Sequence, residues 1–482
     1  MTTPPSARGR RTPRPYRRPR KDPARLVAFK ALRAVDERDA YSNLVLPALL
    51  REAERTAGFD RRDAALATEL VYGALRHQGT YDAIIAACVN RPLREVDPPV
   101  LDVLVLGAHQ LLGTRIPPHA AVSATVELAR VVLGEGRATF VNAVLRRIAA
   151  RELDAWLEEV APPYDDGPED HLAVVHSHPR WVVSALWDSL GRWQPRGSGR
   201  PGIEALLAAD NARPEVTLVA RPGRATAAEV RASLPEGTTQ PGRWSPYAVR
   251  LSEGGDPAAV EAVRDNRVGV QDEGSQLVAA ALAAAPLDGR DRLWLDGCAG
   301  PGGKAALLAA LAAARGAALV ASEKQPHRAR LVAAALDGNP GPYTVIAADG
   351  TRPAWRPGSF DRVLVDVPCS GLGSLRRRPE ARWRRRPEDL PAFGPLQRDL
   401  LRSALTAARP GGLVGYATCS PHLAETRAVV DDVLRDRSDV EWIDARPLLP
   451  LLPDLGDGPD VQLWPHLHGT DAMYLALLRR TH

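Results

Sequence analysis

Two cysteines lie in similar polar settings, each directly after an apolar run. The stretch VDVPCSGLGS holds Cys369, and the stretch YATCSPHLAE holds Cys419. A thiolate is a strong nucleophile that can form a covalent intermediate with an electrophilic carbon. Only two other cysteines occur, Cys88 and Cys298, and no C-x-x-C spacing indicates a zinc site or a disulfide framework. The sequence therefore predicts two reactive thiols, a buried apolar Cys88 and no metal.

A glycine-rich loop, LDGCAGPGGKA, follows an earlier apolar run. It is not a Walker A loop, because Cys298 stands where the first glycine belongs and Ala305 where the hydroxyl belongs. Gly300, Gly302 and Ala305 fit the looser G-x-G-x-x-G/A pattern, in which the backbone approaches a nucleoside-containing cofactor. A plain glycine turn before a helix is the alternative. The residues predicted to bind the cofactor here are Cys298, Ala299, Gly300, Pro301, Gly302, Gly303 and Lys304.

Three acids follow the ends of later apolar runs. Glu323 in ASEKQ is placed to hold a ribose diol, and Asp349 in AADGT to accept from an adenine amino group. Asp366 in VDVPCSG also stands at the end of an apolar run and is likewise expected to contact the cofactor. Lysine is rare in this arginine-rich chain, so Lys304 is expected to place a compact ammonium near the cofactor or substrate.

These residues need a scaffold that brings the ends of several strands together. From about residue 265 to 482 the sequence alternates apolar runs, polar loops and helical segments, which predicts a doubly wound, mainly parallel sheet. In such sheets ligands bind beyond the carboxyl ends of the strands. Every cysteine of this region falls at one of those ends.

The preceding sequence divides into three further parts. Residues 1–22 are rich in Pro and Arg, which predicts a disordered basic tail. Residues 23–160 repeat apolar positions at three- and four-residue steps, so they should form one all-helical domain. Residues 171–264 mix helical and strand-like pieces, which predicts a small α/β module for RNA recognition or linkage. At 482 residues, several domains are expected.

Charge and hydropathy limit the classes of partner. The net charge of +5, the pI near 9.1 and the run RRRPEARWRRR favour a polyanion such as nucleic acid. Solvated arginines without a partner are the alternative for both the tail and the run. No signal-peptide pattern or membrane span is evident, so we expect a cytoplasmic protein without a membrane partner.

At this point several motifs carry a family resemblance. LDGCAGPGGKA, ASEKQ, AADGT, VDVPCSG, RRRPEARW, LQRDLLRSAL and YATCSPHLAE, in this order, resemble the S-adenosylmethionine-dependent RNA 5-methylcytosine methyltransferases. The helical domain, with SNLVLPALL and FVNAVLRRI, resembles the RNA-binding domain of the NusB type. The combination is similar to bacterial 16S ribosomal RNA methyltransferases. It implies an all-α NusB-like domain followed by a Rossmann-like methyltransferase domain.

The resemblance also implies roles for individual residues. Cys419 would be the nucleophile that attacks C6 of cytosine, and Cys369 would assist product release. Asp366 would bind or protonate N3 of the base. Ser420 and Pro421 read as the start of a helix, which would stabilise a Cys419 thiolate at the helix N-terminus. The residues expected to bind RNA phosphates are Arg376, Arg377, Arg378 and Arg382.

Some positions depart from the usual pattern of that family, and alternatives remain open. Gly300 stands where alanine is usual, Val367 also replaces alanine, and Glu323 replaces a frequent aspartate. The partner is expected to be RNA, most simply 16S ribosomal RNA, with S-adenosylmethionine as cofactor and the chain as a monomer. The alternatives are the same chemistry on transfer RNA, or a non-catalytic RNA-binding or ribosome-assembly factor.

Overall fold

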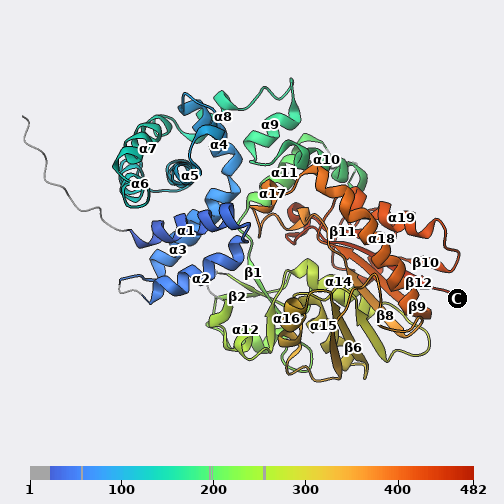
Figure 1. The fold of residues 1–482 in the computed structure, drawn as a ribbon. Helices are drawn as coiled ribbons and strands as arrows, with labels where there is room; N and C mark the ends of the chain where they lie inside the picture. The colour runs from blue at the N-terminus through green and yellow to red at the C-terminus, as the bar shows by residue number, and fades with distance from the viewer. Residues whose placement is uncertain (1–21, 56–57, 195–196, 198, 253–256) are drawn as a thin grey trace, which may run out of the picture. The chain divides into compact units, whose positions relative to one another are not determined.

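The computed structural model describes residues 22–55, 58–194, 197, 199–252 and 257–482 (Figure 1). The tail predicted for residues 1–22 lies outside this part, apart from Asp22. The chain divides into two compact units, residues 1–160 and 161–482. No helix among the described residues is long and apolar enough to cross a membrane.

The first unit is helical, as its apolar periodicity predicts. Its central helix α5 is apolar on most of its circumference, and its neighbours α1, α3, α4, α6 and α7 pack around it. Asp22 begins the first helix by accepting a hydrogen bond from the backbone N–H of Arg25. The helices of this unit are α1 (Pro23–Arg38), α2 (Ser42–Glu54), α3 (Arg61–Arg76), α4 (Gln78–Cys88), α5 (Pro98–Leu112), α6 (Pro118–Leu133), α7 (Glu135–Ile148), α8 (Leu153–Val160) and the 3-10 turn η1 (Leu93–Glu95).

The second unit contains a large mixed sheet in the order β10-β12-β9-β8-β5-β6-β7, with β11 paired to β12. The five strands from β9 to β7 in this order run parallel, whereas β12 is antiparallel to both β9 and β10. The strands are β5 (Leu293–Asp296), β6 (Ala318–Glu323), β7 (Tyr343–Ala347), β8 (Phe360–Asp366), β9 (Ala408–Thr418), β10 (Val440–Ile443), β11 (Val461–Gln462) and β12 (Tyr474–Arg480).

Helices cover both faces of this sheet (Figure 1). One apolar core joins α14, α15 and α16 to the sheet, and another joins α10, α11, α18 and α19 to it. Because helices cover both faces, β8 is buried from Phe360 to Val365, and its central residues Val363, Leu364 and Val365 form an apolar run. The helices are α9 (Pro168–Val175), α10 (Arg180–Trp193), α11 (Arg200–Asn211), α12 (Ala227–Ala232), α13 (Glu261–Arg264), α14 (Glu273–Ala284), α15 (Gly303–Ala313), α16 (Pro326–Leu336), α17 (Ala381–Arg384), α18 (Leu390–Ala407), α19 (Arg427–Leu434) and α20 (Pro465–His468). Its 3-10 turns are η3 (Pro257–Ala259), η4 (Leu372–Ser374), η5 (Pro387–Asp389), η6 (Leu423–Glu425) and η7 (Arg446–Leu448).

The strand order reverses direction between β5 and β8. The chain moves outward from β5 to β6 and β7, and then returns to place β8 on the other side of β5. Such a reversal opens a crevice beyond the carboxyl ends of the two central strands. The sheet therefore directs the loops after β5 and β8 toward a common ligand site.

A second, smaller sheet has the order β2-β3-β1-β4. Its strands are β1 (Val216–Ala220), β2 (Thr239–Pro241), β3 (Ala248–Leu251) and β4 (Val268–Val270), and all its pairings are antiparallel. Because β4 pairs with β1, this sheet extends beyond the boundary predicted at Arg264. The three-residue run VGV gives no indication in the sequence that it pairs with β1, which lies about fifty residues earlier in the chain.

Candidate active site

The large sheet brings the predicted acids and thiols to one edge. β5 ends at Asp296, β6 at Glu323 and β8 at Asp366, while Cys419 directly follows β9. β8 and β9 pair in parallel with Asp366 opposite Ala417, so the P-C-S-G and T-C-S loops leave the sheet side by side. The similar settings of the two cysteines in the sequence therefore correspond to neighbouring positions in space.

The two thiols are in direct contact. The Sγ atoms of Cys369 and Cys419 lie 3.4 Å apart, and both residues are half-buried. The hydrogen bond between the two thiols lowers the pKa of Cys419, and the ammonium of Lys304 lowers it further. The same contact and burial raise the pKa of Cys369. The two pKa shifts have opposite directions, so Cys419 is the thiol of the pair that ionises more readily.

The physical reason for a reactive Cys419 differs from the one predicted. α19 begins only at Arg427, and Ser420 is not its N-cap. The Ser420 hydroxyl instead donates to Glu425 and accepts from the backbone N–H of His422. The helix-terminus explanation is therefore wrong, and the pKa of Cys419 is lowered by the contact with Cys369 and by the Lys304 charge instead.

Lys304 and Asp366 form an ion pair next to the thiols. Lys304 lies in the first turn of α15, and its Nζ is 2.8 Å from the Asp366 Oδ2. The Asp366 side chain remains partly exposed, at 28%. One carboxylate and one ammonium group thus lie beside the two thiols at the topological switch point.

The glycine loop forms a close backbone cradle after β5. Gly302 has φ +110°, and a Cβ there would lie 2.6 Å from the Ala335 Cβ, so a side chain does not fit. The Ala299 N–H donates to the Ser322 carbonyl oxygen, which ties the loop to β6. A Cβ at Gly300 would lie 2.1 Å from the Glu323 Oε2. The loop and the acid at the end of β6 are therefore adjacent, as a nucleoside cofactor requires.

Asp296 is a site residue that the sequence reasoning missed. It is 1% exposed, its Oδ1 accepts from the Cys298 N–H, and its Oδ2 is buried without a hydrogen-bond donor in the described structure. Burial, followed by the nearby Asp366 charge, raises the pKa of Asp296 to about 7. The sequence did carry a signal for Asp296, because the apolar run LWLD ends in this acid just as the run VLVD ends in Asp366.

These features fit the S-adenosylmethionine that the resemblance implies. A buried carboxylate oxygen without a donor can accept from a ligand N–H or O–H group. Glu323 is nearly buried and accepts from the Gln325 N–H, while its second oxygen lies 3.8 Å from Arg328. Asp296, Glu323 and the glycine cradle would hold the cofactor.

Asp349 is more constrained than predicted. Its Oδ2 lies 2.9 Å from the Lys324 Nζ, and its Oδ1 accepts from both the N–H and the hydroxyl of Thr351. These contacts, led by Lys324, lower the pKa of Asp349 to about 2. The carboxylate keeps 30% exposure, so it can still accept from an additional donor.

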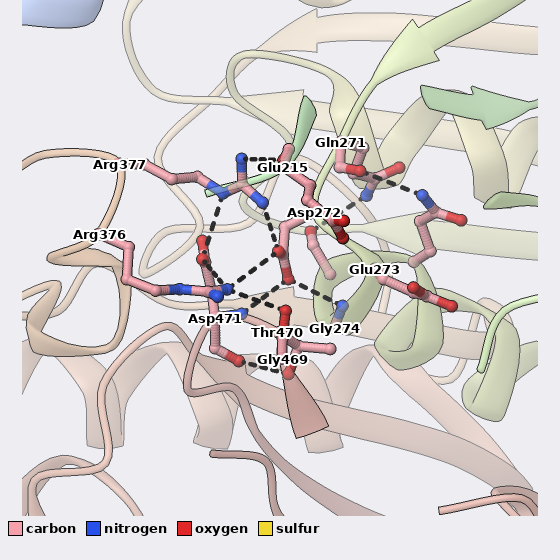
Figure 2. Close-up of polar contacts among 12 residues, drawn as sticks. Glu215, Gln271, Asp272, Glu273, Gly274, Arg376, Arg377, Gly469, Thr470 and Asp471 are labelled. Carbon is pink, nitrogen blue, oxygen red and sulfur yellow. Dashed lines mark hydrogen bonds and ion pairs between the residues drawn. The ribbon is translucent and has the colours of Figure 1, made fainter. Parts of the chain in front are cut away.

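Arg376 and Arg382 are buried, so they do not fit the prediction that they bind RNA phosphates. Arg377 already pairs with two carboxylates. Arg376 is 7% exposed and pairs with Asp471, and Arg377 pairs with both Asp272 and Asp471 (Figure 2). Arg382 is fully buried and donates to the carbonyl oxygen of Ser177. Buried guanidinium groups need such partners because unpaired charge is costly there.

Arg378 is the exposed member of the predicted set. It lies close enough to Cys419 for its charge to lower the pKa of that thiol. Among the four predicted arginines, Arg378 is therefore the one whose exposure and position suit contact with a substrate phosphate.

Comparisons with known proteins agree with this architecture. The sequence pattern of the NusB family matches residues 22–150, and that of the family described as 16S rRNA methyltransferase RsmB/F matches residues 281–479. A Mycobacterium tuberculosis protein, whose name places it provisionally among methyltransferases, is 54% identical over 97% of this chain and 99% of its own length. Ribosomal RNA small subunit methyltransferase B of Pseudomonas putida is 33% identical over 84% of this chain and 87% of its own length.

A solved structure shares the fold of a large part of the chain. The crystal structure of NSun6 from Pyrococcus horikoshii with SFG has a TM-score of 0.51 and 15% identity, and covers 62% of this chain and 98% of that chain. At this identity the likeness concerns the fold alone.

Proposed function

The chain belongs to the RsmB/F family of 16S ribosomal RNA methyltransferases, and we propose that it methylates carbon 5 of a cytosine in 16S ribosomal RNA. Members of this family are S-adenosylmethionine-dependent RNA methyltransferases. The observation that carries the proposal is the contact between Cys369 and Cys419 beside the Lys304–Asp366 pair.

The first step uses the Cys419 thiolate. Carbon 5 of cytosine is a poor nucleophile, and addition of the thiolate to C6 moves the ring's electron pair toward C5. Asp366 stabilises the adduct by hydrogen bonding to, or protonating, N3 of the base. S-adenosylmethionine, when bound, supplies the electrophilic methyl group that the activated C5 attacks.

Release is assigned to Cys369. Once C5 carries the methyl group, solvent water accepts the C5 proton, the electron pair of that C–H bond re-forms the C5–C6 double bond, and the bond between C6 and the Cys419 sulfur breaks. The departing thiolate then needs a hydrogen-bond donor, and the Cys369 thiol supports this role because it lies 3.4 Å from the Cys419 sulfur and its pKa is raised by that contact and by burial. The target base must also be unstacked, which favours a loop or junction of the RNA over a duplex.

The test is transfer of a labelled methyl group to 16S ribosomal RNA and, in parallel, to transfer RNA. We expect wild type to label cytosine C5 of the ribosomal RNA, Cys419→Ala to label neither RNA, and Cys369→Ala to leave a protein–RNA adduct. Undiminished transfer by Cys419→Ala would contradict the mechanism. Labelling of transfer RNA alone would reassign the substrate, and no labelling by wild type would favour a binding role.

A further inference from the structure

Glu425 is a buried carboxylate directly behind the two cysteine loops. It lies in η6, between β9 and α19, and is 1% exposed. Its Oε1 accepts from the Ser370 N–H at 2.7 Å, and its Oε2 accepts from the hydroxyls of Ser370 at 2.5 Å and Ser420 at 2.7 Å. These two serines directly follow Cys369 and Cys419 in the sequence.

We propose that Glu425 is a positioning residue for both cysteines: its carboxylate binds the residue after each one and thereby sets the contact between the two thiols. The inference rests on the proposed cysteine chemistry. It adds a residue that touches neither substrate nor cofactor, and that the motif comparison did not single out.

The geometry of the two loops supports this role. Cys369–Ser370 and Cys419–Ser420 run side by side, with their thiols 3.4 Å apart and their hydroxyls 3.1 Å apart. One backbone hydrogen bond, from the Gly373 N–H to the Cys419 carbonyl oxygen, also joins the loops. Glu425 accepts hydrogen bonds from the serines of both loops, so a shift of either loop would break a hydrogen bond to a buried carboxylate.

Glu425 is itself held from two other elements. Gln397 of α18 donates to the Glu425 Oε1 at 3.3 Å and to the Pro368 carbonyl oxygen at 2.9 Å. The Tyr416 hydroxyl of β9 donates to the Glu425 backbone carbonyl oxygen at 2.8 Å. The carboxylate is therefore a fixed anchor, against which the more exposed cysteine loops are aligned.

The charge of Glu425 also distinguishes the two thiols. After the Cys419 contact and burial, it is among the groups that raise the pKa of Cys369. A negative charge on the Cys369 side disfavours a second thiolate there. The residue that aligns the pair therefore also raises the pKa of Cys369, the thiol of the pair that ionises less readily.

The first test measures the reactivity of each thiol without RNA or cofactor. The protein is treated with iodoacetamide at neutral pH, and the alkylation rates of Cys419 and Cys369 are followed by mass spectrometry of their peptides. Wild type is compared with Glu425→Gln, with Ser370→Ala/Ser420→Ala, and with the control Glu441→Gln, which removes a half-exposed carboxylate in β10. Circular dichroism verifies that each variant is folded.

We expect Glu425→Gln to lower the ratio of Cys419 to Cys369 alkylation about tenfold, the change that corresponds to about one pKa unit. The serine double variant keeps the charge but loses both hydroxyl links, so it should lower the ratio less. Glu441→Gln should leave the ratio unchanged. If Glu425 only stabilised its turn, both thiols would react faster together and the ratio would stay constant, which would overturn the proposal.

The second test is steady-state methyl transfer. We expect both Glu425→Gln and the serine double variant to reduce kcat at least about tenfold, with little change in KM for RNA, because thiol alignment matters for the chemical step. If Glu425→Gln does not fold, the double variant alone decides, and wild-type kcat and alkylation ratio in it would refute the proposal. If Cys419→Ala still transfers methyl groups, the proposed function fails. The alkylation ratios would still test, independently, whether Glu425 aligns the two thiols.

Discussion

At the scale of single residues, Gly300 and Glu323 form a sterically matched pair. A Cβ at Gly300 would lie 2.1 Å from the Glu323 Oε2 and 2.9 Å from its Cδ, so the carboxylate would have to move. Both positions depart from the usual alanine and aspartate of the related motifs. The smaller residue in the loop thus accommodates the longer acid at the end of β6.

This pairing predicts compensation in cofactor binding. Gly300→Ala should weaken S-adenosylmethionine binding about tenfold, or about 1.4 kcal/mol, because it displaces the acid expected to hold the ribose. Adding Glu323→Asp withdraws the carboxylate by one methylene and should restore part of the loss. Calorimetric Kd values for the two single variants and the double variant form a double-mutant cycle. Additive effects would contradict the pairing, and Gly136→Ala, whose Cβ meets nothing within 4 Å, is the control.

Asp296 predicts a pH dependence of stability. Burial raises its pKa to about 7, above the ordinary value of 3.8, so the folded state favours the protonated acid. The stability that this group contributes is full below about pH 4 and is lost as the pH rises through about 7. Asp296→Asn stays neutral, so its free energy of unfolding relative to wild type should rise by about 2–4 kcal/mol between pH 5 and pH 8. Denaturant unfolding at the two pH values measures this difference, and an equal difference at both would contradict the assignment.

At the scale of elements, the segment after P-C-S-G is fixed by a buried ion-pair cluster. Arg376 and Arg377 reach Asp272, the N-cap of α14, and Asp471, in the loop before β12 (Figure 2). Burial opposes ionisation of Asp272, but the two guanidinium groups lower its pKa overall. The cluster joins three chain segments that lie about a hundred residues apart in the sequence.

Breaking this cluster should destabilise the second unit. Arg377→Ala leaves two buried carboxylates with fewer partners, so the free energy of unfolding should fall by about 3 kcal/mol. Arg377→Lys should restore little, because a single ammonium cannot replace the several directed donors of a guanidinium. Arg378→Ala, at an exposed neighbour, should change stability by less than about 0.5 kcal/mol. Urea unfolding compares the three variants, and equal effects of Arg377→Ala and Arg378→Ala would contradict a structural role for Arg377.

The same segment shows what sequence reasoning can and cannot predict. The motifs around Cys369 and Cys419 predicted their strand-end positions, because an apolar run followed by a polar loop is a local signal. The burial of Arg376 and Arg382 was not predictable, since their partners at Asp471 and Ser177 are distant in sequence. The role of Glu425 was missed for the same reason, because one of its donors, Ser370, lies fifty-five positions earlier.

At the scale of the whole molecule, each unit has its own apolar core. The core of the first unit is built from residues between Ala24 and Val160, and the three cores of the second unit contain only residues from Tyr164 onward. A unit with its own core can unfold separately. The residues proposed to hold the cofactor, by contrast, all lie in the second unit.

We therefore expect two thermal transitions with different ligand responses. S-adenosylmethionine at about one hundred times its Kd should stabilise the second unit by about 2.7 kcal/mol and leave the other transition unchanged. Ile84→Ala, in the fully buried core of the first unit, should cost about 2–5 kcal/mol and lower only the transition that the cofactor does not move. Scanning calorimetry of both proteins with and without cofactor measures these shifts. A single transition that both changes displace would mean that the two cores unfold together, because only then could a ligand bound to one unit stabilise the other.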